Sequence, residues 1–226
     1  MTYAQLEYYI SQPRLNRFLR ACGNSKSKTQ RLYKINLRVA QAFYPLMNLF
    51  ETFIRNAIYN ELTNHFNDPD WIINQKQRFM SDPSLSASNF FLKTSVLKAE
   101  QKVRRTGCQI TSSKIIAEHA FGFWTAFFDP HHFKLVQGAP LSAFPNKPKV
   151  VNRSTMTGKL NRIREFRNRI YHNEPICFRG ASIDFLLAKT VIDDIHDIME
   201  WIDPSLKAYT DYFNNINSKI EQAGQL

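Results

Sequence analysis

The sequence predicts a mainly helical, all-α protein, and three observations support this fold class. Apolar residues recur at intervals of three and four through long stretches, as they do along one side of an α-helix, and alternating patterns are rare. Only 7 of the 226 residues are glycine. Hydrophobic residues make up 43% of the chain and aromatic residues 13%, which is ample for a packed core. We expect a single helical domain over residues 1–226.

The first 66 residues predict three helices. A short one covers 3–20 and is broken at a proline, and a second runs from about 29 to 44. Pro45 should interrupt the pattern or start the next helix, which extends from 46 to 66. That third segment has the clearest apolar stripe and is expected to be a core helix. The stripe consists of Leu46, Phe50, Phe53, Ile54, Ala57, Ile58, Leu62 and Phe66.

The middle of the chain alternates between irregular and helical patterns. Two Asp-Pro turns indicate irregular structure over 67–88, and a polar, basic helix should follow over 88–105. A further helix is expected over 112–128, with a dense aromatic cluster. This cluster could stack nucleic-acid bases, but its helical spacing favours a place in the core. It consists of Phe121, Phe123, Trp124, Phe127 and Phe128.

The last hundred residues predict a turn, a long loop and three helices. Residues 129–132 are typical of a turn, and the prolines of 137–153 exclude a helix interior there, so we expect a loop within the domain. The adjacent His131 and His132 have no partner ligand at a recognisable spacing, so no metal site and no cofactor is predicted. Helices should cover 154–171, 182–201 and 204–222.

Charge points to a polyanionic partner without choosing one. The formal net charge is +11, from 30 Lys and Arg against 19 Asp and Glu. RNA, DNA or an anionic membrane would be attracted, and simple solubility is the alternative explanation. No stretch offers the roughly 18 uncharged apolar residues of a membrane helix, and the start lacks the pattern of a signal peptide. Together with three unpaired-looking cysteines, these features predict a cytoplasmic protein that does not bind membranes.

One segment of the predicted helix 154–171 carries a possible reactive centre. Its apolar residues Leu160, Ile163, Phe166 and Ile170 should face inward. Steps of four, three and four then place Asn161, Glu165, Asn168 and His172 on a second, polar face, which Arg167 flanks.

These residue types suit cleavage of a phosphodiester. Imidazoles move protons near neutral pH, and a guanidinium stabilises charge that develops on phosphorus. Asn168 could orient the imidazole of His172 or a phosphate oxygen. RNA supplies its own nucleophile, the 2′-hydroxyl, so such a centre needs no metal. The alternative is structural, because cationic residues near a helix C-terminus are favoured by the helix dipole whatever the function.

Residues 167–172, Arg-Asn-Arg-Ile-Tyr-His, resemble the Arg-x(4–6)-His motif of HEPN proteins. The continuation 173–176 resembles the Abi-like (AbiD/AbiF-type) abortive-infection proteins, as do 49–56 and the stretch Gly122-Phe123-Trp124. This resemblance covers roughly residues 30–176. It implies a HEPN-like helical bundle, here with extra N-terminal helices and a long proline-rich loop. It also implies a homodimer whose two Arg and His pairs face one cleft, and RNA cleavage that leaves a 2′,3′-cyclic phosphate.

The same resemblance implies a role in phage defence or in a toxin–antitoxin system, with an antitoxin or other regulatory partner. Within it, Arg167, Asn168 and His172 would be catalytic. The alternative is a non-catalytic module of the same family that binds RNA, a nucleotide or a protein.

An internal echo of the motif occurs at Arg55-Asn56, with Asn60 in place of the histidine. Chemistry is therefore assigned to the second copy, since only histidine carries protons near neutral pH. Glu51, Arg55, Asn56 and Tyr171 could support the cleft, although a polar brace between helices is an equal explanation for the first three. RNA should be attracted by Lys93, Lys98, Lys102, Arg104, Arg105, Arg162, Arg164 and Arg169.

Overall fold

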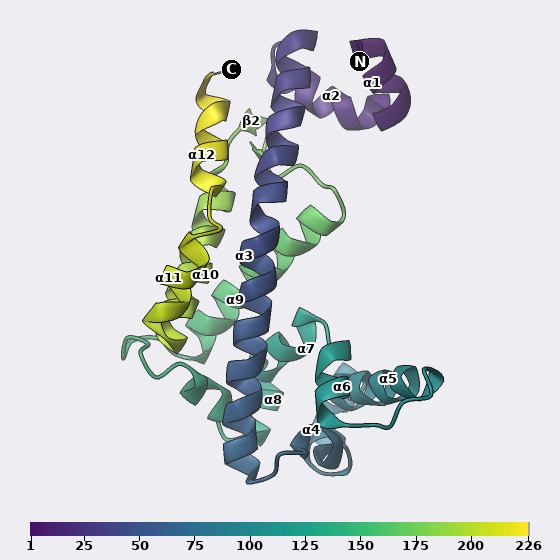
Figure 1. Cartoon of the computed structure of the whole chain (residues 1–226), viewed down its shortest axis with the longest axis vertical. Coiled ribbons are helices and arrows are strands. Elements are labelled where there is room, and N and C mark those ends of the chain that lie inside the picture. Colours follow the sequence, from purple (N-terminus) through teal and green to yellow (C-terminus); the bar gives the residue numbers. More distant parts are fainter. Residues whose placement is uncertain (226) are drawn as a thin grey trace. The chain divides into compact units, whose positions relative to one another are not determined.

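The computed structural model describes residues 1–225, with side chains through Ala223, and confirms a mainly helical chain (Figure 1). A hairpin of two short strands is the one sheet in this part of the chain. The chain forms two compact units. Unit 1 comprises residues 1–49, 165–195 and 208–226, and unit 2 comprises residues 50–164 and 196–207. Within the described residues, no helix combines the length and apolarity needed to cross a membrane.

Three long helices contribute residues to both units. They are α3 (Lys26–Phe66), α9 (Arg153–Tyr171) and α10 (Leu186–Ile202). The helix α11 (Pro204–Asp211) also crosses a boundary between the units, at residue 208. Unit 1 further contains α1 (Tyr3–Ile10), α2 (Gln12–Ala21), β1 (Phe178–Arg179), β2 (Ser182–Ile183), α12 (Ile216–Glu221) and the 3₁₀ helix η6 (Gln222–Gln225).

Unit 2 is built from short elements. Its α-helices are α4 (Trp71–Asn74), α5 (Phe91–Arg105), α6 (Ser112–Glu118), α7 (Phe121–Thr125) and α8 (Pro130–Leu135). Its 3₁₀ helices are η1 (Gln75–Gln77), η2 (Phe79–Ser81), η3 (Pro83–Ser88), η4 (Ala126–Phe128) and η5 (Ala139–Ala143).

The prediction of two helices separated at Pro45 is wrong, because α3 is continuous from Lys26 to Phe66 and contains that proline. A proline inside a helix removes one backbone hydrogen bond, and burial of the surrounding side chains offsets the loss. Phe43, Leu46 and Met47, next to the proline, are almost completely buried. Packing therefore overrides the local preference for a break.

The C-terminal boundaries also need correction. The helix predicted over 182–201 begins only at Leu186, because Ser182 and Ile183 pair with β1 in the hairpin. Gly180, with a φ of 61°, makes the turn. The helix predicted over 204–222 is interrupted after Asp211, where the Asn214 side chain accepts a hydrogen bond from the Ile216 amide at 3.2 Å. Asparagine side chains of this kind compete with helical backbone bonding.

The aromatic cluster of residues 121–128 belongs to the core of unit 2. All five rings are at most 3% exposed, so the interpretation as a base-stacking platform is wrong. Trp71 contributes to the same core, with its ring 5.8 Å from that of Phe127. The helix predicted over 112–128 is divided at His119, whose backbone is extended. The His119 ring instead stacks on that of Phe123 at 3.7 Å.

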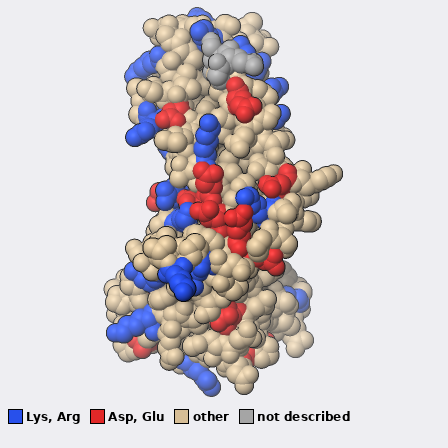
Figure 2. Space-filling model, turned by 90° about the vertical axis from the view of Figure 1, so that its left-hand side faces the viewer, with Lys and Arg blue, Asp and Glu red and all other residues tan. Residues whose placement is uncertain are grey.

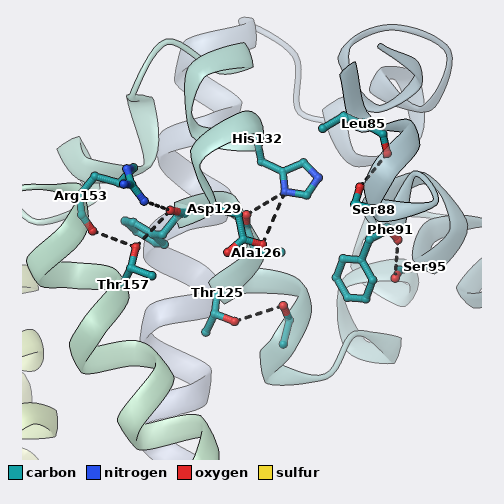
Figure 3. A network of polar contacts seen from close by, with 12 residues as sticks. Leu85, Ser88, Phe91, Ser95, Thr125, Ala126, Asp129, His132, Arg153 and Thr157 are labelled. Carbon is teal, nitrogen blue, oxygen red and sulfur yellow. Dashed lines mark hydrogen bonds and ion pairs between the residues drawn. The ribbon is translucent and has the colours of Figure 1, made fainter. Parts of the chain in front are cut away.

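The turn predicted at 129–132 is the first turn of α8, with Pro130 at its start, a position where the missing N–H costs nothing. His132 is buried, and its Nδ1 lies 3.0 Å from the Ala126 carbonyl oxygen (Figure 3). Arg153 and Thr157 both donate to the Phe128 carbonyl, at 3.0 and 3.1 Å. These bonds attach α8 and the start of α9 to the aromatic core. The predicted loop at 137–153 contains the short η5 and is otherwise non-helical until α9 begins at its last residue, Arg153.

Unit 1 has its own apolar core, and a buried polar contact ties α3 to the chain that follows α9. Phe43 of α3 packs on Phe166 of α9, with ring centroids 4.8 Å apart. Asn36 of α3 is buried, and its side-chain oxygen accepts the Ile176 amide hydrogen at 2.9 Å. The amide would otherwise be buried without a partner, so Asn36 fixes the chain that follows α9.

Replacing Asn36 by alanine is expected to lower the free energy of unfolding by about 1–3 kcal/mol, because a buried amide loses its acceptor. Urea denaturation of the wild type and the variant measures the change. Asn60→Ala, at an exposed position of the same helix, is the matched control and should change stability little. Equal stability of all three proteins would contradict the assigned role.

Stability should fall as the pH is lowered below 6.5. Burial lowers the pKa of His119 from 6.5 to about 4, and burial also lowers the pKa of His132. His119 stays mostly neutral in the folded protein as the pH falls from 6.5 towards 4, whereas the unfolded chain takes up a proton there, so the unfolded state gains stability as pH falls. The lowered pKa of His132 acts in the same direction. His119 alone accounts for a loss of up to about 3 kcal/mol.

Denaturation at several pH values between 7.5 and 4.5 tests this expectation. His119→Phe should flatten the dependence, because phenylalanine retains the stacking on Phe123 and cannot be protonated. The exposed His131, changed to Phe, provides the control and should leave the dependence unchanged. An identical pH profile for the wild type and His119→Phe would rule the explanation out.

Candidate functional site: the carboxyl end of α9

The residues of the predicted reactive centre lie at the carboxyl end of α9. The four apolar residues expected to face inward, Leu160, Ile163, Phe166 and Ile170, are each at most 5% exposed, as predicted. Glu165, Asn168 and His172 are exposed, whereas Asn161 is half-buried. The helical periodicity of the sequence thus separates the buried face from the polar face correctly.

The helix ends in a Schellman motif that fixes the backbone around His172. The Glu174 amide donates to the Arg169 carbonyl at 2.8 Å, and the Asn173 amide donates to the Ile170 carbonyl at 3.0 Å. Asn173 adopts the left-handed conformation that this motif requires, with a φ of 55°. His172 is therefore the last residue before the chain reverses, and its backbone amide still bonds to the Asn168 carbonyl at 2.9 Å.

Arg167 is held against an aromatic ring. Its guanidinium carbon lies 4.2 Å from the centroid of the Tyr171 ring, one helical turn along α9. The Tyr171 ring meets Tyr44 of α3 edge to face, with centroids 5.4 Å apart. Both tyrosines are 44% exposed, so the stack lies at the surface of unit 1. Cation–π contact limits the freedom of an otherwise flexible arginine side chain.

Asn168 and His172 form a row beside the Arg167–Tyr171 row, since each pair is four residues apart on one helix. An exposed imidazole, an exposed amide and a half-buried arginine therefore lie within six consecutive residues at the surface of unit 1. Such a set can accept and deliver a proton, donate hydrogen bonds to an oxyanion and neutralise negative charge. Tyr171, predicted as a supporting residue, contacts Arg167 directly.

The nearby arginines differ in their surroundings. Arg169 lies 3.5 Å from the Glu174 carboxylate, so part of its charge is offset within the cap. Arg164 belongs to unit 2, where it is half-buried and donates to the Thr125 hydroxyl at 3.4 Å. Arg162 is also half-buried in unit 2. These residues are less available to a polyanion than the sequence suggested.

The basic residues of α5 belong to unit 2. Lys98, Arg104 and Arg105 are exposed, and Lys93 is half-buried. Lys102 is exposed and forms an ion pair with Glu118 of α6 at 2.5 Å. The exposed arginines at the end of α5 also lie near the negative end of the helix dipole, which favours cations there.

The first copy of the motif lies on α3 in unit 2. Arg55 is half-buried, and its Nε donates to the side-chain oxygen of its neighbour Asn56 at 3.2 Å. Asn56 is exposed and Glu51 is half-buried. The two copies of the motif thus belong to different units. The role of Glu51, Arg55 and Asn56 as support for the cleft stays a prediction.

The positive charge is not spread evenly over the surface. On the face shown in Figure 2, many Asp and Glu side chains gather near the middle of the view and others lie scattered, while Lys and Arg occur in small separate groups. The excess of +11 charges therefore does not create a continuous basic surface on that face. Among the described residues, no three His, Cys, Asp or Glu side chains lie close enough to hold a metal ion.

Sequence reasoning missed the contribution of α3 to this site. Tyr44 supports the Arg167–Tyr171 pair, yet it lies more than 120 positions earlier in the sequence. The only local signal was its place on the polar side of the α3 stripe, which does not identify a partner. Comparison with protein-family models, with curated proteins and with solved structures finds no match for this chain.

Proposed function

We propose that the protein is a metal-independent endoribonuclease whose reactive groups are His172, Arg167 and Asn168. The observation that carries the proposal is that all three residues lie within positions 167–172 at the carboxyl end of α9, with the guanidinium held over the exposed ring of Tyr171. The resemblance to HEPN proteins of the Abi-like type supports the same residues.

In this reaction the 2′-oxygen of a ribose attacks the adjacent phosphorus, and the bond from phosphorus to the 5′-oxygen of the next nucleotide breaks. His172 takes the proton of the 2′-hydroxyl as a general base, and a second acid returns a proton to the departing 5′-oxygen. The products are a 2′,3′-cyclic phosphate and a free 5′-hydroxyl. Arg167 stabilises the charge on the phosphoryl oxygens, and Asn168 orients a phosphate oxygen or the imidazole.

A homodimer supplies the second acid without further residue types. If two copies place their α9 ends in one cleft, His172 of each can take one of the two proton-transfer roles. The exposure of His172 and of the Tyr44–Tyr171 pair is compatible with that arrangement. The biological role that follows is growth arrest by RNA cleavage, in phage defence or in a toxin–antitoxin system with a silencing partner.

A non-catalytic binding module is the second candidate function. The cap geometry supports it, because a structural role explains part of the motif without catalysis. His172 ends a helix whose Schellman motif accounts for Asn173 and Glu174 on structural grounds alone. In that case Arg167 and His172 would bind a phosphate-bearing ligand and transfer no proton.

The two functions are separated by incubating purified protein with end-labelled RNA in the presence of EDTA. The wild type should cut and leave cyclic phosphate ends. His172→Ala should lower the rate about 10²–10⁴-fold, because it removes a general acid–base group. Arg167→Lys should lower it by about 10² or more, since lysine keeps the charge and loses the planar fork.

His131→Ala, which removes an exposed histidine from unit 2, is the matched control and should cut at the wild-type rate. Thermal denaturation of each variant separates loss of chemistry from loss of folding. Equal cleavage by the wild type and a folded His172→Ala protein, or cleavage that stops with EDTA, would sink the enzyme proposal.

A further inference from the structure

A polar groove in unit 1 lies between α3 and the segment that joins α11 to α12. It has a volume of about 500 Å³. Arg38, Gln41, Ala42 and Pro45 of α3 form one wall, and Phe213, Asn215 and Lys219 form the other. Figure 1 shows α12, in yellow, alongside the first part of α3. No residue of the predicted reactive centre lines this groove.

The lining residues have the chemistry of a binding site for a nucleotide strand. Arg38 and Lys219 carry positive charge, and neither forms an ion pair with a side chain that the structure describes. Gln41 and Asn215 offer amide donors and acceptors. The two cations can bind phosphates, and the two amides can form hydrogen bonds with base edges or sugars.

Phe213, one of the residues that line the groove, belongs to an exposed group of three aromatic rings. Phe213 is 40% exposed, and its ring lies 5.9 Å from that of Tyr209 and 5.0 Å from that of Tyr212. Tyr209 and Tyr212 are themselves 58% and 87% exposed. Three large rings at the surface beside two cations match the combination that binds single-stranded nucleic acid, in which bases stack on rings and cations hold the backbone.

The groove adjoins the candidate reactive centre through α3. Gln41 of the groove wall is three residues from Tyr44, so the two side chains are neighbours on the helix surface. Tyr44 contacts the Tyr171 ring, and the guanidinium of Arg167 lies over that ring. A strand that lies across the α9 end can therefore continue over Tyr44 into the groove within unit 1.

We propose that this groove binds a segment of single-stranded RNA beside the bond to be cut, with backbone phosphates on Arg38 and Lys219 and a base on Phe213. The proposal rests on the proposed function in that the substrate is RNA. It specifies an unpaired strand, because a base in a duplex is already stacked on its neighbours and cannot stack on a protein ring.

Binding is measured by fluorescence anisotropy with a labelled, fully 2′-O-methylated 12-nucleotide strand. This probe keeps the bases and phosphates but has no free 2′-hydroxyl, so the proposed reaction cannot consume it. The wild type should bind the single strand more tightly than a duplex of the same sequence. Arg38→Gln combined with Lys219→Gln should weaken binding of the strand at least tenfold, and Phe213→Ala roughly fivefold or more.

Salt dependence distinguishes contact with phosphates from a general loss of structure. The slope of log affinity against log salt should fall by about 1.4 in the double variant, because two single-strand phosphate contacts are lost. Arg14→Gln combined with Lys28→Gln removes the same charge from exposed positions of unit 1 outside the groove. This control should keep most of the affinity and the slope.

The results separate the two proposals. The wild type should bind the methylated strand whether or not it cuts unmodified RNA, since the probe cannot react and the groove is lined by residues outside the reactive centre. Loss of cleavage in His172→Ala with unchanged strand binding in the groove variants would support the nuclease and overturn the groove. Weaker binding in the groove variants without any RNA cleavage by the wild type would support the groove and overturn the nuclease.

Discussion

The end of α9 is the constraint on which the candidate site depends. The chain must stop being helical directly after His172, because the Schellman bonds of Asn173 and Glu174 reverse it there. Asn173 accepts the left-handed conformation at lower cost than most residues with a side chain, and Pro175 prevents the helix from resuming. The reversal leaves His172 exposed and brings Ile176 to its buried bond with Asn36. Cap, site and core attachment thus occupy ten consecutive residues, 167–176.

Because the cap, the candidate site and the attachment to the core share these ten residues, effects on function and on stability are difficult to separate here. Arg169 belongs to the motif by sequence, yet it forms an ion pair with the carboxylate of the cap residue Glu174. Arg167, by contrast, lies over an exposed ring, where the planar face of its guanidinium gains contact. The two arginines differ by two positions, so they project from different sides of the helix. A helical wheel predicts that the two arginines lie on different sides of the helix, but it does not predict which residue each of them contacts.

Much of the fold followed from periodicity. The buried residues of α9 and of the second part of α3 agree with their three- and four-residue spacing, because a helix has no other way of burying those side chains together. The failures occurred where a short local signal competed with packing or turn chemistry. Pro45 did not end α3 because its neighbours are buried, and the hairpin of 178–183 was missed because two residues per strand are too few for a pattern. The site residues could be proposed from the motif, whereas Tyr44 and the groove require chain segments that are distant in sequence to meet.

Pro45 has one more effect, on the backbone of the helix it occupies. A proline has no amide hydrogen, so the carbonyl oxygen four residues earlier, that of Gln41, receives no bond from position 45. Gln41 is also part of the groove wall, so this backbone irregularity lies in a stretch of α3 that lines the groove. The proline that sequence reasoning mistook for a helix boundary therefore leaves a carbonyl without its usual helical donor inside a long, continuous helix.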